Sequence, residues 1–136
     1  MEENAYLITG ATSGIGKSIS LALADKKAIL FLIVRDIEKY YKVFNGYNNC
    51  TPILLDLAEV DNIESVLKSK IDCKLSGVVL AAGIEETFPI KLYSPKKIKS
   101  FFDINFFSNF EILRIVTGKK YINNNSSIVI MSSVMA

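Results

Sequence analysis

The sequence predicts an α/β fold in which helices cover both faces of a doubly wound parallel sheet of about five strands. Short apolar runs alternate with helical patterns along the whole chain, as in successive βα units. The apolar runs lack polar alternation, so both faces of each strand are expected to be buried. Right-handed βα connections give a doubly wound sheet, for which we expect the strand order 3-2-1-4-5. Residues 1–136 contain no repeat, linker or composition change, and we expect one domain.

Five apolar runs are the predicted strands. Pro52 lies near the start of the third run and has no amide hydrogen, which favours an edge strand. The last run leads directly into Ser132 and Ser133, so two hydroxyl groups are expected at the carboxyl end of a strand. The predicted strands are residues 5–9, 28–34, 51–55, 77–82 and 128–131.

Helical patterns fill the intervals between these strands. The first helix is expected over residues 14–27 and a short second helix over residues 37–44. Asp61 and Glu64 resemble a capping box that opens a third helix running to about Lys70.

A long fourth helical region is predicted before the last strand. Ser94 as cap and Pro95 in the first turn indicate its start, and the helical pattern reaches about Tyr121, with room for a break. The sequence "NNNSS" at residues 123–127 then indicates a turn.

Composition excludes several classes of function. The net charge is +2 and the lysines are scattered, so we expect no nucleic-acid partner. Histidine is absent, which removes Ser-His-Asp triads, Cys-His pairs and histidine-based metal sites, and no metal site is expected. Cys50 and Cys73 lack metal-ligand spacing and are expected to be free thiols rather than a disulfide.

Membrane insertion and secretion are not expected either. The longest apolar run, residues 28–34, is too short to span a bilayer. The first residues, "MEEN", are acidic and polar and do not resemble a secretory signal. We therefore expect a soluble, cytoplasmic protein.

The strongest motif is "TGATSGIG" at residues 9–16, between the first strand and the first helix. Gly10 permits a tight turn, Gly14 lets a ligand approach the backbone, and Gly16 allows close helix packing. Free amide hydrogens and the helix dipole favour an anion at this point. A plain glycine turn is the alternative, but the flanking strand and helix favour a dinucleotide pyrophosphate site.

The spacing Thr-Gly-x-x-x-Gly-x-Gly resembles the short-chain dehydrogenase/reductase family, in its non-extended branch. Asp56 and Leu57 look like the family's adenine-contacting pair. Residues 80–83, "LAAG", align with its Asn-Asn-Ala-Gly element, although Leu80 and Ala81 stand in place of the two asparagines.

Two further segments extend this resemblance toward the carboxyl end. "FFDINFFSNFEILR" looks like the family's fourth-helix segment and makes Asn105 the match for its structural and catalytic asparagine. "IVIMSS" looks like the strand that delivers the catalytic serine, for which Ser133 fits better than Ser132.

The resemblance implies a Rossmann-type domain and an oxidoreductase that moves a hydride between a nicotinamide cofactor and a small carbonyl or alcohol substrate. It implies Ser133 and Asn105 as catalytic residues. The cofactor-binding residues expected from the motif and the resemblance together are Gly10, Ser13, Gly14, Ile15, Gly16, Arg35, Asp56, Leu57, Ala82 and Gly83.

The end of the second strand suggests which cofactor is preferred. A carboxylate there would bond the ribose hydroxyls and repel a 2′-phosphate. That position looks like Val34, followed by Arg35, whose guanidinium can form paired bonds to a phosphate. NADP(H) is therefore favoured, and a one-residue slip that placed Asp36 on the ribose would favour NAD(H).

The family's Tyr-x-x-x-Lys pair lies on the helix after the serine strand, and the sequence ends before that helix. The pair Tyr93 and Lys97 precedes the serine strand and is read as a coincidence, with Tyr93 packed on the surface and Lys97 solvated. The fifth strand would then form a bare apolar edge. The favoured explanation for the missing helix is that the sequence is a fragment of a longer enzyme. The alternatives are a naturally short gene product and an edge that a second chain covers.

Two rival functions stay open. The chain could be a non-catalytic module that binds a dinucleotide or assembles through its open edge, and the uncovered strand predicts self-association. The other rival is a nucleotide-sugar epimerase of the extended branch. The glycine spacing and the position of Asn105 argue against it.

Overall fold

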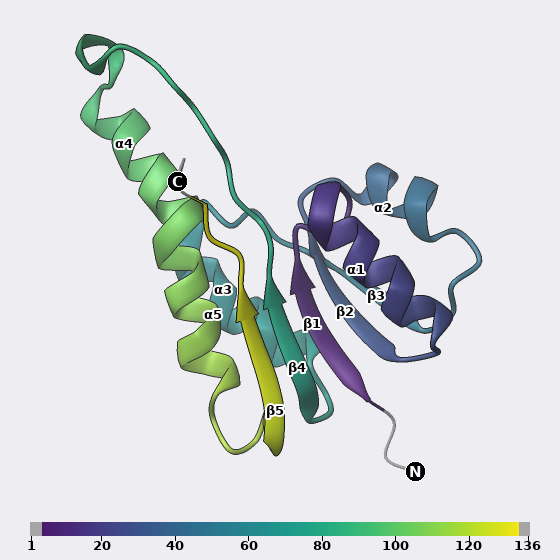
Figure 1. Cartoon of the computed structure of the whole chain (residues 1–136). Coiled ribbons are helices and arrows are strands. Elements are labelled where there is room, and N and C mark those ends of the chain that lie inside the picture. The colour runs from purple at the N-terminus through teal and green to yellow at the C-terminus, as the bar shows by residue number, and fades with distance from the viewer. Residues whose placement is uncertain (1–3, 134–136) are drawn as a thin grey trace.

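The computed structural model describes residues 4–133 and confirms the predicted α/β fold (Figure 1). Five strands form one sheet in the order β3-β2-β1-β4-β5, and all neighbouring pairs are parallel. The carboxyl ends of the strands therefore meet at one edge, and the winding reverses between β1 and β4. The strands are β1 (Ala5–Thr9), β2 (Ile29–Val34), β3 (Cys50–Leu54), β4 (Leu75–Leu80) and β5 (Ile122–Ile130).

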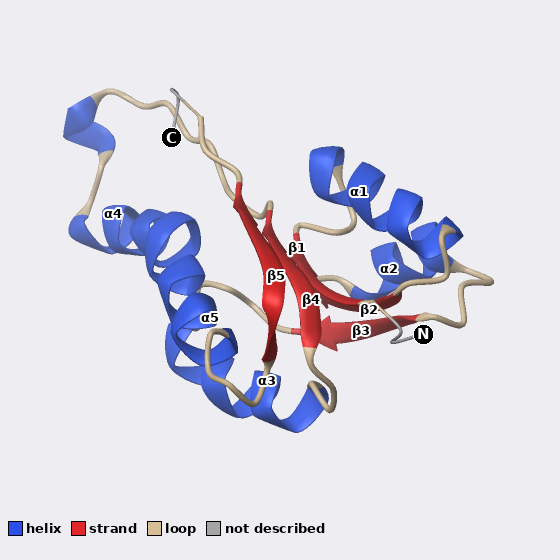
Figure 2. Ribbon diagram, turned by 60° about the horizontal axis from the view of Figure 1, so that its bottom comes forward, coloured by secondary structure: helices blue, strands red, loops and turns tan. Residues whose placement is uncertain are grey.

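Helices lie against both faces of the sheet (Figure 2), although β5 keeps exposed apolar side chains. One apolar core lies beneath α1 and α2 and includes Ala24, Tyr40 and Phe44. The second lies beneath α3 and α5 and includes Leu67 and Ile112. The helices are α1 (Gly14–Asp25), α2 (Ile37–Phe44), α3 (Ile63–Lys70), α4 (Pro95–Phe102) and α5 (Ser108–Val116), with 3-10 turns at Val60–Asn62 and Ile90–Leu92 and a π-helical turn at Asp103–Phe107.

Strand β2 shows why the apolar runs are unbroken. Leu30 and Leu32 pack into the core beneath α1 and α2, whereas Phe31 and Ile33 pack into the opposite core. All four side chains are at most 4% exposed. A strand that is buried on both faces has no position for a polar side chain.

The region between α4 and β5 differs from the prediction in two places. The long helical region ends at Val116 rather than near Tyr121; the π-helical turn Asp103–Phe107 is the break for which the pattern left room. Residues 123–127 are part of β5 rather than a separate turn, although the strand is irregular there, because Leu75 pairs with Ile122 while Gly77 pairs with Ser127. The extra length is held by the Ser126 hydroxyl, which donates to the Leu75 carbonyl at 2.6 Å.

The two predicted helix caps have different outcomes. The capping box at Asp61 is wrong, because Asp61 lies in a 3-10 turn and α3 begins after Asn62 without a side-chain cap. Glu64 instead forms an ion pair with Arg114 on α5, at 2.7 Å. The Ser94 cap is confirmed, since its hydroxyl accepts a hydrogen bond from the Lys97 amide at 3.2 Å.

Both cysteines are free thiols, as predicted. Cys50 is buried, and burial raises the pKa of its thiol to about 11. A thiol with this pKa stays protonated at neutral pH and is a poor nucleophile. None of the helices within residues 4–133 has both the length and the hydrophobicity that a membrane-spanning helix requires.

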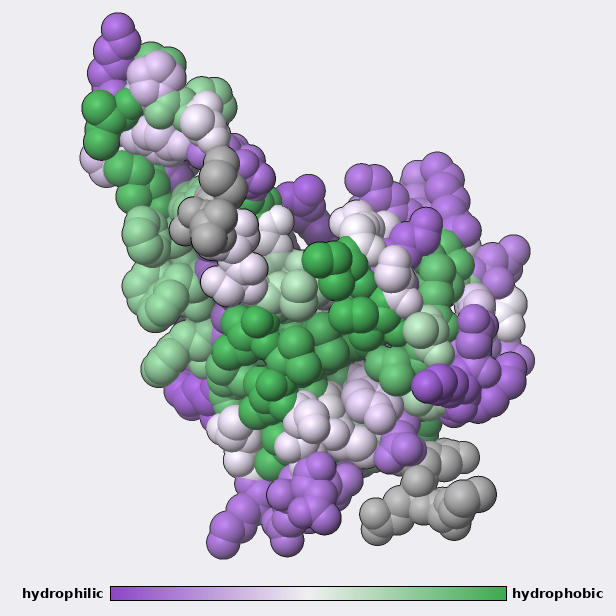
Figure 3. Space-filling view, viewed as in Figure 1, coloured by the Kyte–Doolittle hydropathy of each residue, from purple (hydrophilic) through white to green (hydrophobic). Residues whose placement is uncertain are grey.

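Strand β5 forms an exposed apolar edge of the sheet. Ile128, Val129 and Ile130 are 40%, 46% and 53% exposed. Figure 3 shows apolar surface gathered over the central face of the sheet, around β4 and β5.

A buried hydroxyl fixes the end of β4 against the end of β1. Thr9 is fully buried, and its Oγ1 accepts hydrogen bonds from the amides of Ala81 and Ala82, both at 3.0 Å. These donors are backbone groups, so alanine in place of the family's asparagine leaves both bonds in place. The two chain segments that follow β1 and β4 are thereby held together.

Replacing Thr9 by valine is expected to lower the free energy of unfolding by about 3 kcal/mol, because two amides lose their acceptor. Thr9→Ser is the matched control: it keeps the oxygen, loses one buried methyl group and should cost only about 1 kcal/mol. Urea denaturation of both variants measures the difference. A valine variant as stable as the serine variant would show that the two bonds contribute nothing.

Candidate functional site

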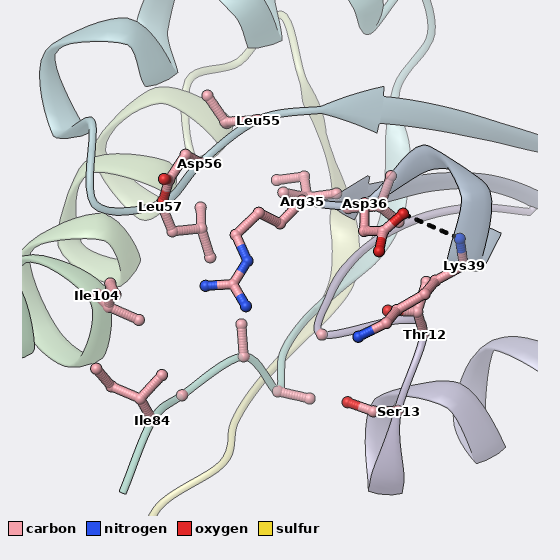
Figure 4. A pocket seen from close by; sticks show the side chains of 16 residues that line it. Thr12, Ser13, Arg35, Asp36, Lys39, Leu55, Asp56, Leu57, Ile84 and Ile104 are labelled. Atoms are coloured by element: carbon pink, nitrogen blue, oxygen red, sulfur yellow. Dashed lines mark hydrogen bonds between the residues drawn. The ribbon is translucent and has the colours of Figure 1, made fainter. Parts of the chain in front are cut away.

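A cavity of about 320 Å³ lies at the carboxyl edge of the sheet. Its walls come from the segments that follow β1, β2, β3 and β4 (Figure 4), so it occupies the crevice where the winding reverses. Ligands of open α/β sheets bind at this place. The predicted cofactor-binding residues that line it are Gly10, Ser13, Arg35, Asp56, Leu57, Ala82 and Gly83.

The glycine-rich turn is closely packed on its inner side. A Cβ atom on Gly10, whose φ is +68°, would lie 2.9 Å from backbone atoms of Ala81 and Ala82. A Cβ atom on Gly16 would lie 2.3 Å from the Gly10 carbonyl oxygen. Neither position accepts a side chain, so the start of α1 packs directly against the end of β1.

The outer side of the same turn is open. Gly14 has a φ of +52°, and nothing lies within 4 Å of the place its Cβ atom would occupy. The Ser13 side chain does not cap α1, and the first turn holds no acidic residue. The first amide hydrogens of α1 are therefore available to an anion, and the helix dipole favours one there. A pyrophosphate fits this open turn.

Gly14, Ile15 and Gly16 do not themselves line the cavity. Gly14 and Ile15 are exposed at the start of α1, beside Ser13. Gly16 is buried behind the turn, where it packs on Gly10. The three residues therefore contribute backbone, and their roles in cofactor binding stay predictions.

Arg35 and Asp36 are adjacent but point differently. Asp36 is the cap of α2: its Oδ1 accepts from the amides of Glu38 at 3.0 Å and Lys39 at 3.2 Å. The Arg35 guanidinium extends into the cavity (Figure 4). The Asp36 carboxylate is thus bonded to helix amides, and the cation is the group presented to a ligand.

The opposite side of the cavity is mostly apolar. Leu57, Ile84 and Ile104 form this wall in Figure 4. The Asp56 carboxylate accepts from the Ala58 amide at 2.9 Å, which fixes the turn after β3 and the direction of Leu57. An apolar wall beside a charged one suits a flat base attached to a phosphorylated sugar.

Several residues that line the cavity were not expected from the sequence. Thr12, Lys39, Ile84 and Ile104 lie in the cavity wall, and none was named as a site residue. Lys39 belongs to the first turn of α2, directly after β2, so the rule that ligands bind at strand carboxyl ends could have found it. Ile104 could not be found this way, because it comes from the π-helical turn.

Asn105 does not line the cavity but bonds to Ile84, which does. It sits in the π-helical turn, a feature that is frequent at functional sites. Its Oδ1 accepts from the Ile84 amide at 2.8 Å, and its Nδ2 donates to the Ile84 carbonyl at 2.9 Å. A Cβ atom on Gly83 would lie 3.1 Å from this Oδ1. Asn105 therefore holds the loop that follows β4.

Ser133 lies beyond the end of β5 and is exposed, outside the cavity. It belongs to the segment that leaves the carboxyl edge of the sheet. The catalytic roles expected for Ser133 and Asn105 stay predictions.

Tyr93 and Lys97 form a surface cluster away from the cavity. The Tyr93 hydroxyl donates to the Glu86 carbonyl at 2.7 Å, and its ring packs on Phe88. Lys97 is exposed, as expected, and its Nζ lies 3.8 Å from the centre of the Phe88 ring. The attraction between the ammonium group and the ring explains this position.

Comparison with known proteins agrees with this geometry. An uncharacterized oxidoreductase of Listeria monocytogenes is 30% identical over 111 residues, covering 77% of this chain and 45% of that protein. A 3-amino-tetrahydro-pyrrolizinone reductase of Xenorhabdus hominickii is 30% identical over 109 residues, covering 77% of this chain and 37% of that protein. The chain spans about half the length of the curated relatives it matches.

Solved structures show the same similarity. The crystal structure of a short-chain dehydrogenase/reductase from Vibrio parahaemolyticus superimposes with a TM-score of 0.79 at 26% identity, covering 94% of this chain and 56% of that one. The family model described as short chain dehydrogenase matches residues 4–136. The protein therefore belongs to the short-chain dehydrogenase/reductase family of oxidoreductases.

Proposed function

We propose that this chain binds NADP(H) in the cavity at the carboxyl edge of the sheet and forms the cofactor-binding part of a carbonyl or alcohol oxidoreductase. The observation that carries the proposal is the open glycine turn, where uncapped amides of α1 face solvent beside the cavity. A bound nicotinamide cofactor would supply the hydride-transfer chemistry.

The residues of the chain divide the binding task by chemistry. The amides of the turn from Gly10 to Gly16 hold the pyrophosphate. Arg35 bonds the phosphate on the adenosine ribose, and the apolar wall around Leu57 receives the adenine. NADP(H) is preferred over NAD(H) because the cation faces the cavity while the Asp36 carboxylate is engaged with α2.

The substrate end is assigned to Asn105 and Ser133. Asn105 holds the loop of Gly83 and Ile84 in place through Ile84, and so positions the cofactor wall. The Ser133 hydroxyl polarises the oxygen of a small carbonyl or alcohol substrate. The 136 residues contain no Tyr-x-x-x-Lys pair after this serine, so we expect cofactor binding without measurable turnover from these residues alone.

A second candidate role is assembly between two copies of this chain through β5. The apolar side chains of Ile128, Val129 and Ile130 are exposed and favour burial against another surface. An uncovered edge strand also presents unpaired backbone groups that a second copy can bond.

Substituting Gly14 by alanine is expected to weaken NADP⁺ binding at least tenfold, because the new methyl group would occupy the place of the pyrophosphate. Gly46→Ala is the matched control: Gly46 also has a positive φ, +89°, and open space around its Cβ position. Both changes should cost about 1 kcal/mol of stability. Isothermal titration calorimetry measures the affinities; equal loss in both variants would contradict the site.

Replacing Arg35 by glutamine should lower the affinity for NADP⁺ about tenfold and leave that for NAD⁺ within twofold, since a charged hydrogen bond to phosphate is lost. Asp36→Asn retains a helix-capping side chain but removes the charge, and should not weaken NAD⁺ binding. Isothermal titration calorimetry with both oxidised cofactors tests this. Weaker NAD⁺ binding by the asparagine variant would place Asp36 on the ribose and reverse the preference.

Self-association through β5 predicts a concentration-dependent mass in light scattering after size-exclusion chromatography. Val129→Lys should shift the chain to monomer, because a lysine on an edge strand opposes strand pairing. Lys42→Gln on α2 serves as a surface control and should change nothing. A wild-type chain that stays monomeric at high concentration would rule out this role.

A further inference from the structure

A second cation enters the cavity from α2. Lys39 lies in the first turn of this helix and lines the cavity together with Arg35. Figure 4 shows its side chain leaving α2 and pointing toward the space that the Arg35 guanidinium also enters. The two cations come from different elements, the segment after β2 and helix α2, and approach one space.

Neither cation has an acidic partner among the described residues. The ion pairs within residues 4–133 join Glu64 with Lys68 and with Arg114, Glu111 with Arg114, and Lys99 with Asp103. Asp36 and Asp56, the two carboxylates in the cavity wall, both accept backbone amide bonds instead. Two unpaired positive charges in one concave site favour an anion.

The position of Lys39 is fixed by its neighbour. Its backbone amide donates to the Asp36 carboxylate, so the acid that would repel a phosphate also anchors the first turn that carries the lysine. The negative charge of Asp36 is thereby directed toward the amides of α2, and the Lys39 side chain lies on the cavity side.

We propose that Lys39 is a second binding residue for the 2′-phosphate of NADP(H), opposite Arg35. The inference rests on the proposed function and deepens it. The planar guanidinium suits paired bonds to two phosphate oxygens, whereas the ammonium group is a compact charge that can meet a third. Lys39 therefore contributes to the choice between NADP(H) and NAD(H) and not to binding of the part common to both.

The test is a set of affinities for NADP⁺ and NAD⁺, measured by calorimetry on the 136-residue chain. Lys39→Gln should weaken NADP⁺ binding about tenfold and change NAD⁺ binding less than twofold. Lys39→Arg, which keeps the charge, should retain most of the affinity. Lys42→Gln removes a charge from the last turn of the same helix, outside the cavity, and should leave both affinities unchanged.

Raised salt should reduce the effect of Lys39→Gln, because screening weakens the lost attraction. The inference is overturned if wild type prefers NADP⁺ and Arg35→Gln removes that preference, while Lys39→Gln behaves like Lys42→Gln or weakens both cofactors equally. The proposed function itself fails if wild type binds neither cofactor or prefers NAD⁺. Thermal unfolding of each variant shows whether the fold is kept.

Discussion

Three backbone segments approach closely at the end of β1, and the site depends on this contact. The Gly10 carbonyl touches the start of α1 at Gly16, and Gly10 itself lies against the backbone of Ala81 and Ala82. The buried hydroxyl of Thr9 also accepts hydrogen bonds from the amides of Ala81 and Ala82. With no side chains between them, β1, α1 and the loop after β4 form one rigid corner whose outer surface is left open at Gly14.

The charges around this corner are sorted by local hydrogen bonding. The carboxylates of Asp36 and Asp56 each accept amides from their own turn, which satisfies them and directs them along the backbone. Arg35 and Lys39 have no such local partner among the described residues and reach into the cavity. A chain with small net charge thus presents a positive wall at one place, opposite an apolar one. The proposed binding of a nucleotide phosphate beside its base uses this combination.

Most of the fold could be predicted, because doubly buried strands such as β2 leave a plain apolar signal. The departures arise where tertiary contacts override local patterns. Residues 123–127 have turn composition, yet Ser126 bonds to the Leu75 carbonyl and keeps them in β5. Glu64 resembles a capping residue, but Arg114, fifty positions away, binds it. Within the site, the glycine turn could be predicted because the spacing of its glycines is specific to its geometry. Lys39 and Ile104 were not predicted, because helix packing and a π-helical turn bring them into the cavity wall.

We propose that the free amides at the start of α1 bind the pyrophosphate of a dinucleotide. A titration of the ¹⁵N-labelled chain with ADP-ribose, followed by amide NMR, observes these amides one by one. We expect the largest chemical-shift changes at the amides of Gly14, Ile15 and Gly16, with smaller ones at Ala82 and Gly83. Saturable binding that leaves these amides unmoved, or no binding at all, would contradict it.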